Sequence, residues 1–325
     1  MLARQDIGYE RTSVEREAVI AALNGVLGDH LATTGNPLAL PMRLHHAGVP
    51  LTLQMDALSQ SIPDAGPRLL ILVHGLCMND LQWTRDGHDH GAMLAEAFGY
   101  TPLYLHYNTG RSIAQNGRCF AELLETLRAQ WPTSVEEITL IGHSMGGLLA
   151  RSACHYAAAH GHDWTVSLRN LICMGSPHHG APLERGGRWV DLVLGATPFA
   201  APLARVGKLR SAGITDLRHG HALSAHSRHR PLPLPARVRC YAMAATTGLR
   251  RGDLKDRLIG DGLVPVASAL GHHPDPDRVI GFAKSRQWIG YGMNHLDLLS
   301  HPDVADRLLR WLAQRPAQRR TKRGP

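Results

Sequence analysis

The chain has 325 residues, of which 44% are hydrophobic and 19% charged, a composition typical of a globular protein. Its formal net charge is +8, but six of the positive residues lie between Arg310 and Pro325, where no acidic residue occurs. The body of the chain is therefore nearly neutral, and the basic tail, which has no aromatic residue after Trp311, does not favour nucleic-acid binding.

Residues 1–68 are expected to form an N-terminal segment that leads into the main sheet. The pattern predicts a helix over 13–31, with Ser13 as its N-cap. A hairpin is expected over 42–53, around the turn His46-Ala47-Gly48. Turn-forming residues then occupy 61–67.

From residue 69 to residue 312, short apolar runs alternate with helical patterns. Continuous apolar runs such as 69–73 are typical of strands buried on both faces of a parallel sheet. The alternation therefore predicts an α/β domain with a mostly parallel, doubly wound sheet over 69–312, followed by a disordered basic tail over 313–325. Strands are predicted over 69–73, 102–106, 138–141, 171–174, 238–243 and 287–289, and helices over 91–98, 112–130, 145–160 and 303–312.

One segment, about 181–235, interrupts this alternation. It is rich in Gly, Pro, Arg and His, which indicates an insertion over the sheet rather than a separate domain. Apolar residues recur at helical spacing from Trp189 to Leu194, so one face of this stretch is expected to be apolar. That face either packs on the domain or lines an acyl pocket; in the second case Trp189 and Phe199 would bind substrate.

The most informative motif is Gly142-His143-Ser144-Met145-Gly146, which fits the pattern Gly-x-Ser-x-Gly. It lies between a predicted strand and a predicted helix, as a nucleophile elbow requires. Small residues two positions either side of the serine let strand and helix approach each other. We therefore predict Ser144 as a catalytic nucleophile.

An oxyanion hole in such an architecture takes one N–H from the loop after the first strong strand and one from the residue after the nucleophile. Those donors are predicted to be Leu76, in His74-Gly75-Leu76, and Met145. Gly75 would let the main chain approach the substrate, and we expect His74 and Gly75 to take part in substrate binding.

The acid and the base are expected after the nucleophile in chain order. Asp261 lies between two glycines in Gly260-Asp261-Gly262, a tight turn suited to holding a carboxylate at a strand end. Asp253 and Asp256 are rivals, but basic neighbours surround them. Asp261 is the predicted acid.

Among 21 histidines, His295 follows the last predicted strand and precedes the final helix. His272 and His273 come before that strand, and His301 stands at the start of the helix. His295 is the predicted base: it would take the proton of Ser144 while Asp261 orients its ring.

Four motifs in this order resemble those of bacterial triacylglycerol lipases and GPI inositol-deacylase-like esterases. They are Gly-His-Ser-Met-Gly-Gly (142–147), Gly-Ser-Pro-His-His-Gly (175–180), Gly-Asp-Gly-Leu-Val-Pro (260–265) and Asn-His-Leu-Asp (294–297). The resemblance covers about 69–312. It implies an α/β-hydrolase fold, ester hydrolysis and a helical cap after the sixth strand, and it supports Asp261 and His295.

Some of these lipases bind calcium through an Asp two residues after the catalytic His, which matches Asp297. His301, near the matching later position, is a poor calcium ligand, so no metal is expected. The leading hypothesis is a carboxylic ester hydrolase acting on a small-molecule or lipid ester. A thioesterase or an acyltransferase would use the same triad, and a non-catalytic binding protein is disfavoured because all triad residue types occur in order.

The five cysteines are scattered and form no CxxC pair, which indicates neither a cysteine zinc site nor a redox pair and favours a reducing compartment. The N-terminus lacks the pattern of a signal peptide, and no apolar run approaches the length of a membrane span. We therefore expect a cytoplasmic protein without a transmembrane segment or a cofactor.

Overall fold

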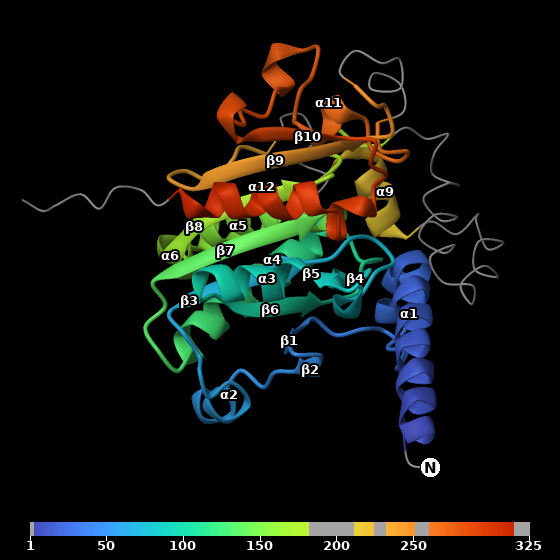
Figure 1. The fold of residues 1–325 in the computed structure, drawn as a ribbon, viewed down its shortest axis with the longest axis vertical. Coiled ribbons are helices and arrows are strands. Elements are labelled where there is room, and N and C mark those ends of the chain that lie inside the picture. The colour runs from blue at the N-terminus through green and yellow to red at the C-terminus, as the bar shows by residue number, and fades with distance from the viewer. Residues whose placement is uncertain (1–2, 182–210, 224–231, 251–259, 315–325) are drawn as a thin grey trace, which may run out of the picture.

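A computed structural model describes residues 3–181, 211–223, 232–250 and 260–314. Within them, an eight-stranded sheet has the order β10-β9-β8-β7-β3-β6-β1-β2 (Figure 1). β3, β6, β7, β8, β9 and β10 pair in parallel, whereas β1 pairs antiparallel with β6 and with β2. The strands are β1 (Arg43–His46), β2 (Val49–Pro50), β3 (Arg68–Val73), β6 (Thr101–His106), β7 (Glu137–His143), β8 (Leu168–Met174), β9 (Arg239–Thr246) and β10 (Gln287–Tyr291), with a separate ribbon of β4 (Thr84–Arg85) and β5 (His88–Asp89).

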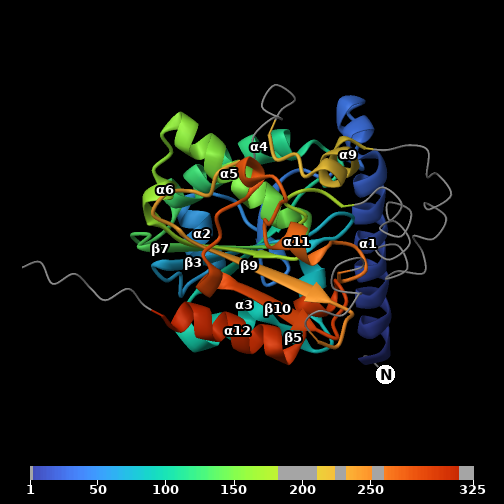
Figure 2. The same cartoon turned by 90° about the horizontal axis from the view of Figure 1, so that it is seen from above.

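Helices cover both faces of the sheet. Figure 2 shows α3 and α12 on one face and α4, α5 and α6 on the other. The α-helices are α1 (Ala3–Thr33), α2 (Met55–Ser61), α3 (His90–Phe98), α4 (Ile113–Gln130), α5 (Met145–His160), α6 (Trp164–Ser167), α9 (Ala212–His219), α11 (Val266–Ala269) and α12 (Pro302–Ala313). Short 3₁₀ turns are η1 (Asp80–Trp83), η5 (Pro276–Arg278), η6 (Lys284–Arg286) and η7 (Asp297–Leu299). No described helix has the length and apolar character needed to cross a membrane.

The central strands are buried because helices lie on both sides of them. All five residues from Leu69 to Val73 are fully buried, as a parallel strand between two helical layers requires. Each side chain of this size stabilises the fold by about 1.5–3 kcal/mol when it leaves water. The predicted doubly wound, mostly parallel α/β sheet is therefore confirmed.

Every strand and helix predicted between residues 69 and 312 is present, with ends within three residues of the prediction, and the hairpin around Ala47-Gly48 is present as β1 and β2. The predicted N-cap Ser13 is wrong, because α1 already begins at Ala3. Four helices were not predicted: α2, the four-residue helices α6 and α11, and α9 within the insertion. Most of that insertion, including Trp189 and Phe199, and the tail from residue 315 lie outside the described residues.

The first helix packs beyond the carboxyl ends of the strands, as Figures 1 and 2 both show. Its backbone is close to the loop after β3, because a Cβ on Gly25 would overlap Cys77 Sγ. Asn108 Nδ2 donates to Gly28 O at 2.8 Å, and Ser211 Oγ, at the start of α9, donates to Gly25 O at 2.7 Å. The N-terminal helix thus contacts three loops at this edge of the sheet.

Candidate active site

Ser144 occupies a sharp turn between β7 and α5. Its backbone has φ 56° and ψ −122°, a combination that costs a residue with a side chain about 1–3 kcal/mol and persists only where the surroundings enforce it. The backbone N–H of Ser144 donates to Met174 O at 2.7 Å, which ties the turn to the end of β8. The side chain is buried, and Ser144 Oγ has no hydrogen-bond partner within the described chain.

Two glycines make this turn possible by allowing main chains to touch. A Cβ on Gly142 would overlap the backbone of Gly146 and Gly147, and a Cβ on Gly146 would overlap Val73 O at the end of β3. The first turn of α5 therefore contacts two neighbouring strands directly. This crossing explains why the motif needs glycine on both sides of the serine.

Asp261 and His295 form a buried pair. His295 Nδ1 lies 2.6 Å from Asp261 Oδ2, and both side chains are 1% exposed. The other carboxylate oxygen, Oδ1, accepts the backbone N–H groups of Leu263 at 2.9 Å and Val264 at 2.7 Å. The aspartate is therefore fixed by its own turn, and it presents one oxygen to the imidazole.

His295 also lies beside the turn that carries Ser144. The ring of His143, the residue before the serine, is 4.7 Å from the ring of His295, and His143 Nε2 lies 3.2 Å from His295 O. A Cβ on Gly175, just after β8, would lie 3.0 Å from His295 Cε1. Ser144 follows β7, Asp261 lies between β9 and β10 in the chain, and His295 follows β10. The three predicted triad residues thus lie at the same edge of the sheet, with β8 between β7 and β9.

The loop after β3 runs past the serine. A Cβ on Gly75 would lie 3.0 Å from Ser144 Cβ, so this loop approaches the turn closely. Leu76 and Met145 are buried. Among the turn, loop and cap hydrogen bonds of the described residues, neither backbone N–H group donates to a backbone carbonyl. His74 is fully buried and stacks on Tyr107, with 4.5 Å between the ring centroids.

Thr109 and Tyr107 hold this loop in place, and sequence reasoning did not find them. Cys77 N donates to Thr109 Oγ1 at 3.1 Å, and Tyr107 Oη donates to His74 O at 2.9 Å. Both lie just after β6, which the pairing with β3 places beside the loop. No motif marks them, because their role depends on strand order rather than on a local pattern.

A carboxylate partner distinguishes His295 from the two other buried histidines near the serine, His74 and His143. Burial lowers the pKa of His74 to about 3 and the pKa of His143 well below its ordinary value, although backbone carbonyls oppose both shifts. Imidazoles with such low pKa values are weak bases at neutral pH. His295 alone of the three is hydrogen-bonded to a carboxylate.

The rival residues have other surroundings. His272 Nε2 lies 3.0 Å from Gln287 Oε1, His273 Nδ1 accepts Asp275 N, and His301 Nδ1 accepts Asp303 N at the start of α12. Asp297 Oδ2 accepts Asn294 N at 2.7 Å within the turn around His295. Asp253 and Asp256 lie outside the described residues.

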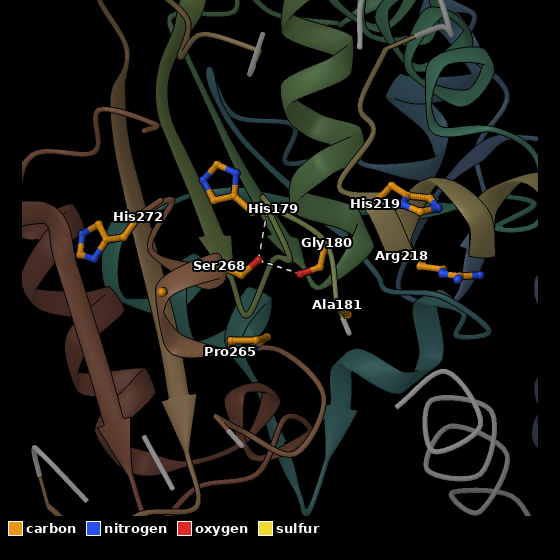
Figure 3. A pocket seen from close by; sticks show the side chains of 9 residues that line it. His179, Gly180, Ala181, Arg218, His219, Pro265, Ser268 and His272 are labelled. Carbon is orange, nitrogen blue, oxygen red and sulfur yellow. Dashed lines mark hydrogen bonds between the residues drawn. The ribbon is translucent and has the colours of Figure 1, made fainter. Parts of the chain in front are cut away.

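A cavity of about 430 Å³ opens between the loop after β8, α9 and α11 (Figure 3). Ser268 Oγ, at its centre, donates to Gly180 O at 2.9 Å and accepts His179 N at 3.1 Å. Pro265, which closes the turn of Asp261, also lines it, but Ser144, Asp261 and His295 do not. The cavity is therefore a neighbour of the acid turn and not the space in front of the serine.

Buried histidines make the stability of the fold depend on pH. Burial lowers the pKa of His90 from 6.5 to about 4, so the unfolded chain binds a proton below pH 6.5 that the folded chain does not bind. Stability is therefore complete above pH 6.5 and is lost as the pH falls, by about 2 kcal/mol per such histidine between pH 7 and pH 5. His74, His143 and His178 share the same direction of shift.

Urea unfolding at pH 7 and pH 5 measures this loss. In His90→Gln the loss between the two pH values should be about 2 kcal/mol smaller than in the unmodified protein. Equal losses would show that His90 takes up its proton in the folded state. His160→Gln, an exposed substitution at the end of α5, is the control and should leave the loss unchanged.

A mostly parallel sheet with helices on both faces and a serine at a glycine-flanked strand-to-helix turn defines an α/β-hydrolase, and the chain has this fold. Residues 68–201 match the PGAP1-like alpha/beta domain. The resemblance to lipases and esterases of this fold, predicted from the four motifs, is confirmed. No curated protein matches the chain.

Solved structures similar to the chain include a lipase, a thioesterase and the protein EstA. Lipase BlEst2 of Bacillus licheniformis in its mature form is 17% identical, with 76% of this chain and 92% of that chain covered and a TM-score of 0.49. The RedJ thioesterase from the prodiginine pathway of Streptomyces coelicolor is 20% identical, with 77% and 91% covered and a TM-score of 0.44. EstA of Clostridium botulinum is 14% identical, with 77% and 87% covered and a TM-score of 0.44.

Proposed function

We propose that the protein hydrolyses carboxylic esters through a covalent acyl-enzyme on Ser144. The observation that carries this proposal is the buried hydrogen bond between His295 Nδ1 and Asp261 Oδ2, at 2.6 Å, beside a serine in a strained turn. A carboxylate that holds Nδ1–H of an imidazole leaves its Nε2 to act as the base. A nucleophile, an oriented base and an orienting acid are the parts that nucleophilic acyl transfer requires.

In the proposed reaction, His295 Nε2 accepts the proton of the Ser144 hydroxyl as its oxygen attacks the ester carbonyl carbon. The tetrahedral oxyanion accepts hydrogen bonds from the N–H groups of Leu76 and Met145, a contribution of about 3–4 kcal/mol per donor to the transition state. The alcohol leaves with the proton from His295. Water then attacks the acyl group by the same route and frees the serine.

The carboxylate of Asp261 supports both steps through charge and geometry. It stabilises the imidazolium that forms each time His295 holds the extra proton. Its backbone partners at Leu263 and Val264 keep it from following the ring. The low-dielectric surroundings of the pair strengthen this interaction relative to water.

The proposed substrate is an ester with an apolar acyl chain, bound with the help of Trp189 and Phe199. If these two side chains line an acyl pocket, kcat/KM should rise from C2 p-nitrophenyl esters to medium chains, because each buried methylene contributes up to about 0.8 kcal/mol. Trp189→Ala and Phe199→Ala should flatten that rise while acetate hydrolysis changes little. The measurement is kcat/KM for C2 to C12 esters in all three proteins.

Val166→Ala is the matched control, since Val166 is an apolar side chain that is 68% exposed on α6. It should leave the chain-length profile unchanged. An optimum at C2 in the unmodified protein would refute the acyl pocket and indicate a short-chain esterase. Absence of hydrolysis across the series, with turnover of a matched thioester, would replace the proposed reaction by thioester cleavage.

A further inference from the structure

Three side chains with metal-binding atoms lie close together where β1, η1 and the end of β6 meet. His45 lies on β1, His106 at the end of β6, and Asp80 at the start of η1. His45 Nδ1 lies 2.7 Å from Asp80 Oδ2, and His106 Nδ1 lies 2.7 Å from Asp80 Oδ1. The ligand atoms of all three residues lie within 4.8 Å of one another.

Strand pairing holds the two imidazoles on one face of the sheet. His45 pairs with Tyr104, so these two side chains lie on the same face of the sheet. His106 is two residues further along β6 and therefore lies on that face too, beside His45. The two rings are nearly parallel, with 4.8 Å between their centroids and an interplanar angle of 9°. Both present the same nitrogen, Nδ1, to the one carboxylate.

The cluster is compact and mostly buried. The side chains of His45, His106 and Asp80 are 13%, 9% and 5% exposed. Two imidazole nitrogens and a carboxylate are a donor set that suits zinc, whereas calcium and magnesium prefer oxygen ligands alone. With zinc–ligand bonds of about 2.0–2.1 Å, tetrahedral ligand atoms lie about 3.3 Å apart. The two histidine–carboxylate distances here are 2.7 Å, and all ligand atoms lie within 4.8 Å of one another, a range that includes this separation.

We propose that His45, His106 and Asp80 form a binding site for a divalent zinc ion. Zinc would bind Nδ1 of each ring and the Asp80 carboxylate, with water as the remaining ligand on the side where His45 is partly exposed. Zinc binding at Nδ1 requires each ring to be neutral, with its proton on Nε2. The ion would replace two hydrogen bonds to one carboxylate by three bonds to one cation.

The position of Asp80 gives the ion a structural role. Asp80 lies three residues after Cys77 and is the first residue of η1, which follows the loop after β3. A bound ion would fasten this segment to β1 and β6 at the edge of the sheet. The inference stands apart from the proposed esterase reaction, because zinc contacts neither Ser144 nor His295.

The test is zinc binding by the full chain, without an affinity tag, in the Ser144→Ala background. Using that variant separates the result from any outcome for ester hydrolysis. After EDTA treatment, dialysis against zinc and removal of the excess, we expect one zinc per chain by elemental analysis. We also expect a higher Tm with zinc than with EDTA, and visible absorption typical of four-coordinate cobalt when Co²⁺ replaces zinc. His45→Gln and Asp80→Asn should each raise the zinc Kd by about 100-fold or more, since loss of a ligand exceeds the 10–100-fold cost of losing an outer-shell partner.

His46→Gln is the matched control for a chain with many histidines. His46 is the next residue on β1, and its Nδ1 lies 2.9 Å from Pro102 O rather than from a carboxylate. It should bind zinc as the parent does. His45→Gln keeps a hydrogen-bond donor beside Asp80, so it preserves the fold if Asp80→Asn does not. Failure of the parent to bind zinc at micromolar concentration, or equal affinity in His45→Gln and His46→Gln, overturns the proposal.

Discussion

Ser144→Ala is expected to lower kcat/KM for ester hydrolysis on the order of 10⁴-fold or more while the protein stays folded. The substitution removes the attacking oxygen and nothing else, because Ser144 Oγ has no hydrogen-bond partner in the described chain. Alanine keeps the Cβ that the turn already accommodates at φ 56°. Initial rates with p-nitrophenyl butyrate and the far-UV spectrum of both proteins measure the two halves of this expectation.

A fluorophosphonate probe identifies the nucleophile directly, since it reacts with an activated serine. It should label the unmodified protein and fail to label Ser144→Ala. Ser176→Ala is the matched control: Ser176 is another buried serine at this edge, and its hydroxyl also has no partner in the described chain. If Ser176→Ala lost the label and Ser144→Ala kept it, the nucleophile would be the wrong serine.

Asp261→Asn is expected to lower kcat/KM by about 10³- to 10⁴-fold with the fold intact. The amide oxygen would keep the hydrogen bonds from Leu263 N and Val264 N, so the amide nitrogen would face His295 Nδ1. An N–H donor at that place stabilises the tautomer with the proton on Nε2, and this tautomer cannot accept the proton of Ser144. Activity would thus be lost because His295 holds its proton on the wrong nitrogen, and not because the site changes shape.

Asp253→Asn and Asp256→Asn make matched controls, because they are the other acids between β9 and the turn of Asp261. Each should change kcat/KM less than twofold, because basic residues surround both in the sequence, as in a solvated charge run. Steady-state kinetics of the three variants rank the candidates. A loss in Asp253→Asn or Asp256→Asn that exceeds the loss in Asp261→Asn would move the acid to the segment before Gly260.

The central fold could be predicted because the sequence repeats one simple pattern there. Apolar runs such as 69–73 are buried on both faces, and the helices between them carry clear start and stop residues, such as Ser112 before α4 and Gly161 after α5. The catalytic candidates could be predicted for a related reason. Glycine-flanked turns at 142–146 and 260–262 carry their geometry in three to five adjacent residues.

The sequence analysis missed features whose local signal is absent or is concealed by the neighbouring residues. Helix α2 has seven residues, and its N-cap Gln54 makes no side-chain hydrogen bond, so nothing in the sequence marks its start. Helix α9 does have a capping serine, Ser211, and a left-handed Gly220 at its end, but the Gly- and Arg-rich surroundings concealed them. The zinc candidate joins residues 45, 80 and 106, which only strand pairing brings together.

The crossing of α5 over the end of β3 has a further consequence for how this protein can change over time. A Cβ on Gly146 would overlap Val73 O and would lie 2.8 Å from His74 O, so backbone touches backbone where the serine turn meets the donor loop. The gap between the proposed nucleophile and the proposed oxyanion donors is therefore set by main-chain thickness, a quantity that every sequence with glycine at 146 shares. Substitutions that change the size of core side chains around the crossing can raise or lower the stability of the protein without changing that distance. Substitutions in the surrounding core should therefore leave the proposed catalytic geometry unchanged, whereas replacing Gly146 by alanine should disrupt it, because a methyl group would take the place of one hydrogen atom.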